Sequence, residues 1–412
     1  MKKMLMVSYY APPLLNAESI LVAKTLKFLS QHFEIDLLTV TQDSDFKEDA
    51  FLMEEMGERV RVIRMPNPKP QSRVMRKLYR EGMNRLFHID NPLWLLRAQK
   101  AIAGLQGPYD VLYSRSMPGA SHVAALAAQA KFGMPWVAQF SDPWGNNPYH
   151  PYSGRKQQVI SGYERQVVEG ASRLVFPTVE IRDLYAAHYP QANIAERSLV
   201  LPHHFDEQLY GTTAGDGKKG RVRLAYIGDF YGLRSPEPLV KGLTLLKERR
   251  PDLVAQLELQ VVGNVEGKFH PSLQEAEKQL GMTVARVGQV PFRKSLELMA
   301  ETDILLLVDA PSDVNLFLSS KLIDYLGARR PILGITSTKG TAGRVLTDYG
   351  WNVHHPDDVP GIAAALESYL SHLPEYQERA RELDVDRYRS EQVVAQLAAL
   401  CEDAIEYKRS AR

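Results

Sequence analysis

Short apolar runs that alternate with longer helical patterns most limit how this chain can fold. The first half contains six of these runs, MLMVS, EIDLLTV, DVLYS, WVAQF, RLVFPT and LVLP. The second half contains six more, VRLAYIG, LELQVVG, VARVGQV, DILLLVD, PILGIT and WNVHH, and the earlier segment RVRVIRMP is a candidate for a further strand. Continuous apolar runs are typical of strands that are covered on both faces. Helices between them predict parallel βαβ units.

The length of the chain and one polar segment predict two domains. The 412 residues are too many for one ordinary hydrophobic core. Residues 206–220 are rich in Gly, Thr and charge, which is typical of a linker. We therefore expect an N-terminal Rossmann-like domain over 1–205, a C-terminal Rossmann-like domain over 221–385, and a terminal helix over 386–412 that can pack back on the N-terminal domain. Parallel sheets bind ligands outside the carboxyl ends of their strands, so two such domains facing each other would form an active-site cleft.

The composition excludes several classes of protein. A formal net charge of +1 gives no overall attraction to nucleic acid, and no nucleic-acid partner is predicted. The single cysteine, Cys401, excludes an intrachain disulfide framework and a cysteine-based zinc site. The apolar run at the N-terminus is too short for a signal peptide, and no stretch is long enough to span a membrane. A cytoplasmic protein is expected.

Several motifs that hold cofactors or metals are missing. No G-x-G-x-x-G follows the first strand, and there is no Walker A, G-x-S-x-G or H-E-x-x-H sequence. Asp384 and Asp386 form an Asp-x-Asp pair, but it precedes the terminal helix and is interpreted as a surface loop. The adjacent His203 and His204 have no evident partner ligands and are interpreted as structural. The sequence therefore predicts no cofactor and no metal site.

A basic residue precedes a helix near the start of the second domain. In LAYIGDFYGLRSPEPLVKGL, Gly228 ends a strand and allows close backbone approach. Ser235 is expected as the N-cap and Pro236 as the first helical residue. Arg234 then lies at the positive end of a helix, which is unfavourable unless an anion lies between them. The alternative is a solvated surface arginine.

The same arrangement recurs in DILLLVDAPSDVNLFLSSKLID. Ser319 and Ser320 are predicted to start a helix, and Lys321 is the basic residue. Asp324 lies three residues further on and shares a helix face with Lys321, so the alternative is an ordinary surface ion pair. Two basic helix starts on one sheet edge can together clamp a diphosphate. Asp324 could then accept hydrogen bonds from the hydroxyls of a ribose.

These segments resemble a known family. The second half, in YIGDFYGLRSPEPL, VVGN, VPFRKSLELMAETDILLLV and SSKLIDYLGARRPILGI, resembles the donor-binding domain of retaining GT-B glycosyltransferases of the family 4 type. The last segment is similar to the family's Ser-Lys-Leu-x-Glu-Tyr motif, with Asp324 in place of the usual glutamate. In the first half, VSYYAPP resembles the opening strand and acceptor loop, and FSDPWGNNPY the Asp-x-Trp segment. The resemblance covers nearly the whole chain.

The resemblance implies the GT-B fold and a transferase activity in the assembly of bacterial surface polysaccharide. A sugar would pass from a nucleotide-diphosphate donor to a glycan or lipid-linked acceptor, with retention and without a metal ion. Arg234 and Lys321 would hold the diphosphate, and Asp324 the ribose. The enzyme mainly stabilises the departing diphosphate and orients the acceptor hydroxyl. The residues expected at the donor site are Gly228, Tyr231, Arg234, Ser320, Lys321, Leu322 and Asp324.

The chain departs from the family pattern at three places. Many members carry an acid eight residues before the position of Asp324, where this chain has Leu316. The glycine pair that is usual after the first strand is replaced by Asn16 and Ala17. Arg115 lies in the segment where many members carry a histidine. These departures leave the sugar contacts open.

The first domain supplies candidates for the acceptor side. Asp142 follows the strand WVAQF and is expected to orient the acceptor or the sugar. Together with Arg234 and Lys321 it makes up the predicted catalytic set. The alternative is that Asp142 forms an Asx-type turn before Pro143. Trp144 is interpreted as packing rather than stacking. The segment around Tyr9 either shapes the acceptor site or is a rigid turn. The residues expected on the acceptor side are Tyr10, Pro13, Asn16 and Arg115.

Residues 72–87 form a basic amphipathic segment. Its basic residues interleave with apolar ones in SRVMRKLYREGMNRLF. Such a helix can lie on an anionic membrane surface, which would place the protein at the inner face of the membrane. The alternative is an ordinary helix that packs on the sheet and has a solvated basic face.

Two other functions fit the same scaffold. A nucleotide-sugar epimerase would release and re-add the diphosphate, but it needs acids and histidines around the sugar, and the sequence offers few. A non-catalytic module that binds a nucleotide sugar is the other alternative, and the departures from the family pattern leave it open.

Overall fold

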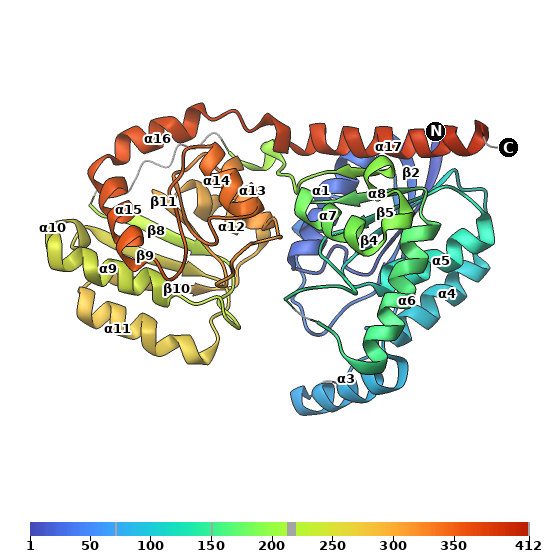
Figure 1. Cartoon of the computed structure of the whole chain (residues 1–412), viewed down its shortest axis with the longest axis horizontal. Coiled ribbons are helices and arrows are strands. Elements are labelled where there is room, and N and C mark those ends of the chain that lie inside the picture. Colours follow the sequence, from blue (N-terminus) through green and yellow to red (C-terminus); the bar gives the residue numbers. More distant parts are fainter. Residues whose placement is uncertain (71, 150, 212–219, 411–412) are drawn as a thin grey trace. The chain divides into compact units, whose positions relative to one another are not determined.

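The chain divides into two compact units. The computed structural model describes residues 1–70, 72–149, 151–211 and 220–410. The first unit comprises Met1–His203 and Ser390–Arg412, and the second comprises His204–Arg389. Most of the segment predicted as a linker, residues 212–219, lies outside the described residues. Each unit is a parallel sheet covered by helices (Figure 1).

The first unit is built on a seven-stranded parallel sheet with the order β3-β2-β1-β4-β5-β6-β7. The strands are β1 (Lys2–Ser8), β2 (Phe33–Val40), β3 (Val60–Met65), β4 (Val111–Ser116), β5 (Trp136–Phe140), β6 (Arg173–Phe176) and β7 (Ser198–Val200). In the central register, Met4 lies opposite Ile35 on one side and Val111 on the other. All six predicted runs of the first half are strands, and RVRVIRMP is the edge strand β3.

Ten helices belong to the described part of the first unit. They are α1 (Ala17–Leu29), α2 (Phe51–Glu54), α3 (Arg73–Phe87), α4 (Pro92–Gly104), α5 (Ala120–Phe132), α6 (Gly154–Gly170), α7 (Val179–His188), η1 (Pro190–Ala192), α8 (Ile194–Arg197) and α17 (Ser390–Ser410). The last helix returns to the first unit, where it packs against α1, β4 and β5. Its residues Val393, Leu397 and Cys401 join the core around Met4 and Leu37.

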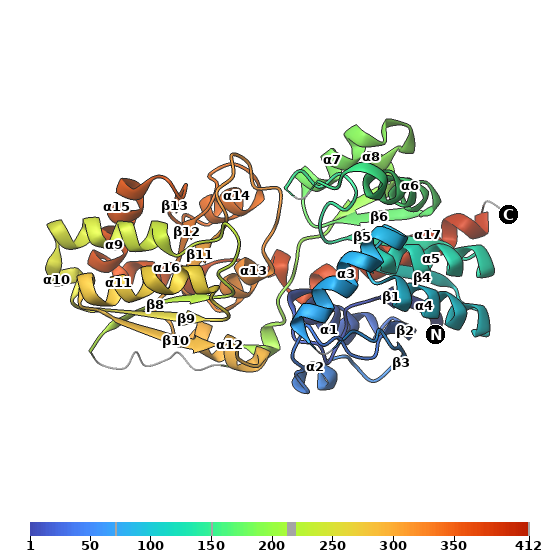
Figure 2. The same cartoon turned by 90° about the horizontal axis from the view of Figure 1, so that it is seen from below.

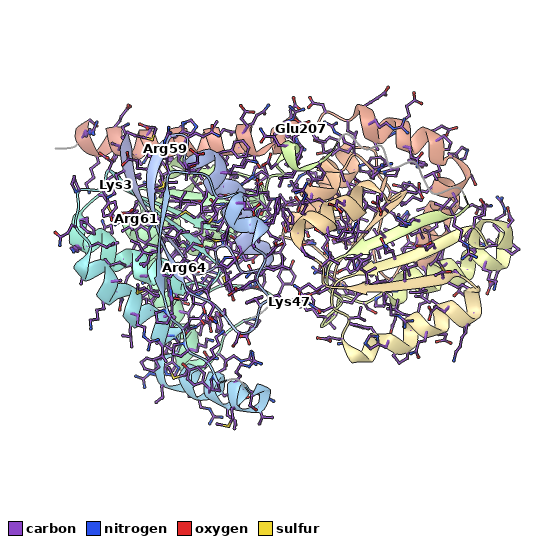
Figure 3. The ribbon with its side chains drawn as sticks, turned by 180° about the vertical axis from the view of Figure 1, so that it is seen from behind. Lys3, Lys47, Arg59, Arg61, Arg64 and Glu207 are labelled. Carbon is purple, nitrogen blue, oxygen red and sulfur yellow. The ribbon has the colours of Figure 1, made fainter. Side chains whose placement is uncertain are left out.

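Charged side chains protect the exposed edge of this sheet. Arg61 on β3 forms two hydrogen bonds with the carboxylate of Asp36, and Arg64 donates to the carbonyl oxygens of Pro12 and Val40. Figure 3 shows these arginines with Arg59 near the edge strand, and Lys3 on β1 close by. Charge on an edge strand hinders pairing with another chain, which explains why this strand is less apolar than the others.

The second unit is built on a six-stranded parallel sheet with the order β10-β9-β8-β11-β12-β13. The strands are β8 (Val222–Ile227), β9 (Leu257–Val262), β10 (Thr283–Gly288), β11 (Ile304–Val308), β12 (Ile332–Ile335) and β13 (Val353–His354). The helices are η2 (Glu207–Leu209), α9 (Glu237–Arg249), α10 (Pro251–Val254), η3 (Gly267–Phe269), α11 (His270–Leu280), α12 (Phe292–Ala300), α13 (Ser320–Gly327), α14 (Thr341–Asp348), α15 (Val359–Ser371), α16 (Leu373–Glu382) and η4 (Asp386–Tyr388). The six runs predicted for the second half are all strands.

Both sheets reverse their strand order beside the first strand of the unit. The reversal lies between β1 and β4 in the first sheet and between β8 and β11 in the second (Figure 2). The carboxyl ends of the strands on either side of such a reversal open a crevice in which α/β proteins bind ligands. The predicted α/β class is therefore confirmed, and the two reversals are the places to look for a site.

Candidate functional site

In the second unit, a glycine lets a lysine lie close to the backbone at the reversal. Gly228 follows β8 and has a φ of 152°. A β-carbon added at Gly228 would lie 2.7 Å from Nζ of Lys321. Residues with a side chain rarely adopt this φ, so a side chain here would cost strain and would displace the lysine. The predicted close approach of the backbone at Gly228 therefore serves Lys321.

Lys321 is the second residue of α13, which begins at Ser320 after Ser319, as predicted. Its Nζ donates to Oη of Tyr226 at 3.0 Å and lies 4.4 Å from the centre of that ring. Desolvation and the neighbouring charge of Arg234 lower the pKa of Lys321 to about 7, although Asp309 and Asp229 act in the opposite direction. The surroundings therefore do not fully compensate the charge of this ammonium group.

Arg234 lies beside Lys321 and pairs with Asp309, one of the two acids whose charge also acts on Lys321. One terminal nitrogen of its guanidinium group is 3.1 Å from Oδ1 of Asp309, and the group lies over the ring of Tyr231. Its Nε is buried and has no hydrogen-bond acceptor among the described residues. Because one donor of the guanidinium group is unsatisfied next to an undercompensated ammonium group, an anion bound here would gain interactions with both.

Asp309 anchors this group to the sheet. It follows β11, is 5% exposed, and accepts hydrogen bonds from Asn315 and Thr336 as well as from Arg234. Asn315 precedes Leu316, the position where the family pattern has an acid. Sequence reasoning missed Asp309, although an aspartate directly after an apolar strand is a signal for the carboxyl edge of the sheet.

The helix after Arg234 begins one residue later than predicted. The first helical residue is Glu237, and Pro236 occupies the capping position. Oγ of Ser235 accepts a hydrogen bond from the backbone N–H of Glu237. The predicted start of the helix was therefore wrong by one residue, although Pro236 already has helical φ and ψ and its carbonyl oxygen accepts a hydrogen bond from the N–H of Val240.

The other residues expected at the donor site surround the start of α13 and the loop after β8. Asp324 is buried, and its carboxylate and its backbone carbonyl each accept a hydrogen bond from Oη of Tyr210. Leu322 is fully buried, whereas the side chain of Tyr231 is exposed. A pocket of about 450 Å³ adjoins the same loops and includes Asp309 in its wall. The roles assigned to these residues stay predictions.

In the first unit, Asp142 is the carboxyl group that follows β5. It is half-buried and forms no hydrogen bond or ion pair with the described residues, so the alternative of an Asx-type turn before Pro143 is not observed. Desolvation, with a smaller contribution from Glu18, raises the pKa of Asp142 to about 7. A carboxyl group of this kind can exchange a proton near neutral pH.

Glu18 and Arg115 form a buried pair beside Asp142. Nε of Arg115 donates to Glu18 at 2.8 Å, and the other carboxylate oxygen of Glu18 accepts from Ser141 at 2.9 Å. Arg115 is 2% exposed, and although burial acts to lower its pKa, the charge of Glu18 leaves the pKa of Arg115 above its usual value. Sequence reasoning missed Glu18, which lies in the first turn of α1 directly after the loop that follows β1.

The remaining acceptor-side candidates shape the loop after β1. Asn16 caps α1 by accepting a hydrogen bond from the N–H of Ser19, and the carbonyl of Pro13 accepts from the N–H of Asp49. Tyr10 packs edge-on against Tyr9 and is half-buried. The loop is well supported, and whether it contacts an acceptor stays a prediction.

Buried polar residues hold the loop after β5. Trp144 is 1% exposed and packs against Gly119, as its interpretation as a packing residue predicted. Glu164 on α6 accepts hydrogen bonds from the N–H of Gly145 and from the hydroxyls of Tyr185 and Tyr189. Sequence reasoning missed Glu164 because a glutamate within a helix ordinarily faces solvent.

The residues set aside as structural are either buried or part of a turn. His203 and His204 are 7% and 5% exposed, and burial lowers the pKa of His203 to about 3. Asp384 accepts a hydrogen bond from the N–H of Asp386 in the loop before α17. Across the described ranges, no group of three histidine, cysteine or acidic side chains is placed to hold a metal ion.

The basic segment 72–87 forms α3, in residues 73–87. The apolar side chains Val74, Leu78 and Leu86 are 69%, 58% and 74% exposed. The alternative of an ordinary helix packing its apolar face on the sheet is therefore wrong, because that face is turned to solvent. No helix in the described part of the chain is long and apolar enough to cross a membrane.

A family model matches most of the first unit. Residues 27–199 match the glycosyl transferase 4-like domain. This span lies within the first unit. A search of curated protein sequences found no match to the chain.

Solved structures resemble the chain over nearly its full length. HepE of Anabaena in complex with UDP has 15% identity and a TM-score of 0.68, covering 98% of this chain and 100% of its own. A glycosyltransferase of Rickettsia africae has 12% identity and a TM-score of 0.68, with coverages of 98% and 99%. WaaG, a glycosyltransferase involved in lipopolysaccharide biosynthesis, has 15% identity and a TM-score of 0.64, with coverages of 97% and 99%. The chain therefore has the predicted GT-B fold.

Proposed function

We propose that this protein transfers a sugar from a nucleotide-diphosphate donor to a glycan or lipid-linked acceptor, with retention at the anomeric carbon and without a metal ion. The observation that carries the proposal is the pair of neighbouring cations at the strand reversal of the second sheet: Lys321, whose charge is undercompensated, and Arg234, whose buried Nε has no acceptor among the described residues. The solved complexes of HepE with UDP and with UDP-glucose support a donor of this class.

The second unit would stabilise the leaving diphosphate. Negative charge develops on the diphosphate as the glycosidic bond breaks, and cations that are fixed in advance stabilise that charge without reorganising. Lys321 and Arg234 would supply the charge, and the first amides of α13, including that of Ser320, would donate hydrogen bonds. With two cations in place, the diphosphate has a counter-charge that does not depend on a metal ion.

The same unit would hold the nucleoside. Asp324 is proposed to accept from the ribose hydroxyls, with Tyr210 fixing the orientation of its carboxylate. Gly228, Tyr231 and Leu322 are proposed to line the remainder of the donor site. A carboxylate is suited to a vicinal diol because it only accepts hydrogen bonds.

The first unit would orient the acceptor. Asp142 is proposed to contact the acceptor hydroxyl, which its raised pKa suits, because the carboxyl group can hold or release a proton near neutral pH. Arg115 and Glu18 would keep the neighbouring Ser141 in place, and Tyr10, Pro13 and Asn16 would shape the acceptor loop. We place the reaction in the cytoplasm, at the inner face of a membrane and in the assembly of surface polysaccharide, with α3 as the membrane contact.

A panel of substrates tests the proposal. The protein is incubated with UDP-, GDP-, ADP- and dTDP-sugars, with and without an extract of lipid-linked acceptors. Release of nucleotide that depends on the acceptor is the expected result. Formation of a new nucleotide sugar would instead identify an epimerase, and binding without turnover across the panel would identify a non-catalytic module.

A further inference from the structure

Beneath α3, the first unit contains a polar pocket of about 620 Å³. Its size is in the usual range for a small-molecule site. One predicted acceptor-side residue, Tyr10, lies in its wall, which connects the pocket to the loop after β1. The charged residues in the wall are Lys69, Arg76, Lys77, Arg80, Asp45 and Asp90. Four cations against two acids give the wall a formal charge of +2.

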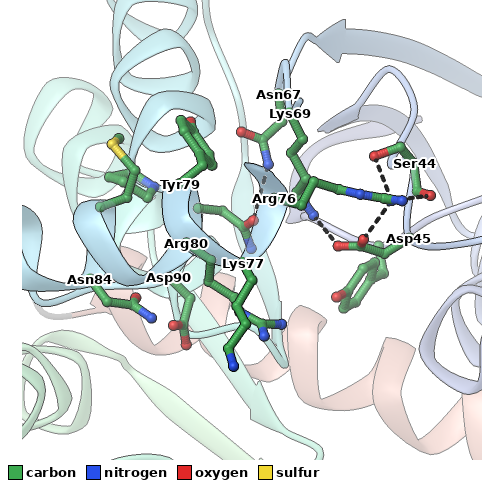
Figure 4. Close-up of a pocket in the computed structure, with 14 residues that line it drawn as sticks. Ser44, Asp45, Asn67, Lys69, Arg76, Lys77, Tyr79, Arg80, Asn84 and Asp90 are labelled. Carbon is green, nitrogen blue, oxygen red and sulfur yellow. Dashed lines mark hydrogen bonds and ion pairs between the residues drawn. The ribbon is translucent and has the colours of Figure 1, made fainter. Parts of the chain in front are cut away.

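The two acids of the pocket already have cationic partners. Asp45 pairs with Lys69 at 2.8 Å and with Arg76 at 3.0 Å. Asp90 is 3.2 Å from Nζ of Lys156. Figure 4 shows Arg76 reaching across the pocket to Ser44 and Asp45. The acids therefore leave the other two cations of the wall uncompensated.

Lys77 and Arg80 are these two cations. Neither forms an ion pair or a side-chain hydrogen bond with any residue in the described ranges (Figure 4). They lie almost one turn apart on α3, so both can reach a single ligand. The chemistry that matches two adjacent, unpaired cations in a polar pocket is a phosphate group.

The helix α3 is amphipathic in the reverse of the usual sense. A surface helix ordinarily turns its apolar side to the domain and its charged side to water. In α3 the side that lines the pocket carries the cations Arg76, Lys77 and Arg80 together with Tyr79 and Met83, whereas the opposite side carries Val74 and Leu78. Of the five exposed apolar side chains on this helix, Val74, Met75, Leu78 and Leu86 lie on the outer side, whereas Phe87 lies at the last turn on the side of Arg76 and Arg80. The outer side therefore suits an apolar environment outside the unit.

We propose that this pocket binds the phosphate group of a membrane lipid, the acceptor of the transfer reaction, while the outer face of α3 lies in the acyl layer. This inference rests on the proposed function and narrows its acceptor to a phosphate-bearing lipid. A helix buried to the depth of the headgroups has its apolar face among the acyl chains and its cationic face at the level of the phosphates. Lys77 and Arg80 then bind the phosphate as the helix enters the membrane surface.

Three double variants separate the parts of the proposal. Lys77→Ala with Arg80→Ala removes the two unpaired cations of the pocket. Arg85→Ala with Lys100→Ala is the matched control, because both residues are exposed, carry the same charge and lie outside the pocket wall. Leu78→Ser with Leu86→Ser removes two side chains from the apolar face. All six positions are on the surface, so the fold is expected to be retained, and circular dichroism checks this.

Binding is measured with dihexanoyl phosphatidic acid in monomeric form, with inorganic phosphate, and with phosphatidylcholine vesicles that contain phosphatidic acid. The pocket variant is expected to lose about tenfold or more of its affinity for dihexanoyl phosphatidic acid, and the charge control about twofold at most. The leucine variant is expected to keep that affinity and to bind the vesicles about tenfold more weakly.

Several results would overturn the proposal. Equal losses in the pocket variant and the charge control would mean that only diffuse electrostatic attraction acts. Binding of inorganic phosphate as tight as that of dihexanoyl phosphatidic acid would identify a site for free phosphate. Absence of lipid binding, together with intact binding of UDP-glucose and transfer to a water-soluble acceptor, would refute the lipid site and leave the proposed function standing.

Discussion

Lys321 and Arg234 lie at the strand reversal of the second sheet, whereas the same point of the first sheet carries the carboxyl groups of Glu18 and Asp142. The six strands of the second sheet follow the same order as the first six strands of the first sheet, so the topology does not cause the difference. In the first unit the cation beside these carboxyl groups, Arg115, is buried and bonded to Glu18 at 2.8 Å. In the second unit Asp309 pairs directly with Arg234 only, and Lys321 has no direct ion pair among the described residues, although the charges of Asp309 and Asp229 act on it. The same backbone arrangement thus suits an anion in one unit and a hydroxyl group in the other.

Removing the amine of Lys321 should have the largest effect. Lys321→Ala is expected to weaken binding of the donor nucleotide about 10- to 100-fold, because one charge-assisted contact to the diphosphate is lost. Calorimetric titration with UDP-glucose and the other donors of the panel measures the change. Lys278→Ala is the matched control, since Lys278 is an exposed lysine on α11 of the same unit. Equal affinities in the two variants would show that Lys321 does not contact the donor.

Asp142 should make the first unit respond to pH. The folded-state pKa of about 7 lies above the usual value of 3.8, so between these values the folded state binds more protons than the unfolded state. The contribution of protonated Asp142 to the free energy of unfolding is therefore complete below about pH 4 and is lost as the pH rises through 7. Asp142→Asn, which cannot ionise, is expected to raise the free energy of unfolding at pH 8 by about 2 kcal/mol relative to the wild type, less than the full shift implies because the side chain is partly exposed.

Chemical denaturation at pH 5 and pH 8 checks this prediction. The exposed Asp183 supplies the control, because Asp183→Asn should change the unfolding free energy by at most about 0.5 kcal/mol at either pH. The contribution of Lys321 to the pH dependence of stability has the opposite sign, because its folded-state pKa is lowered. The unfolding free energy therefore rises as the pH rises above about 7, where the folded state releases this proton before the unfolded state does. If the stability gain from Asp142→Asn were the same at both pH values, a raised pKa of the half-buried Asp142 carboxyl group would be refuted.

The smallest expected effect comes from Gly→Ala substitutions at Gly228 and at its control, Gly220. Gly228 and Gly220 have similar φ values, 152° and 146°, but only at Gly228 would an added β-carbon meet Lys321. Both Gly→Ala substitutions should destabilise the unit by about 1 kcal/mol through backbone strain. Only Gly228→Ala should also weaken donor binding, by about threefold to tenfold, because the amine is displaced. Weaker binding in both variants would attribute the effect to general loss of stability.

The sequence predicted the fold well because the strands are continuous buried runs. DILLLVD could be placed as a strand from its apolar residues alone, and all five residues of β11 are buried. The basic helix starts were visible because Arg234 and Lys321 break a local electrostatic rule. Asp309 and Glu18 were missed because their importance depends on partners that are distant in sequence, such as Thr336 and Arg115. The reversed polarity of α3 also depends on tertiary structure, because the pattern of residues 72–87 does not say which face meets the domain.

The most direct test of the cation pair in the second unit is the titration of the Lys321 amine itself. Nuclear magnetic resonance of lysine labelled at the side chain, with Lys321→Arg to assign the signal, follows protonation with and without UDP. The free protein should titrate near pH 7, and the diphosphate should raise the pKa of Lys321 well above that value, because the bound anion favours the charged form. A pKa of Lys321 that is unchanged when UDP saturates the protein would contradict the account.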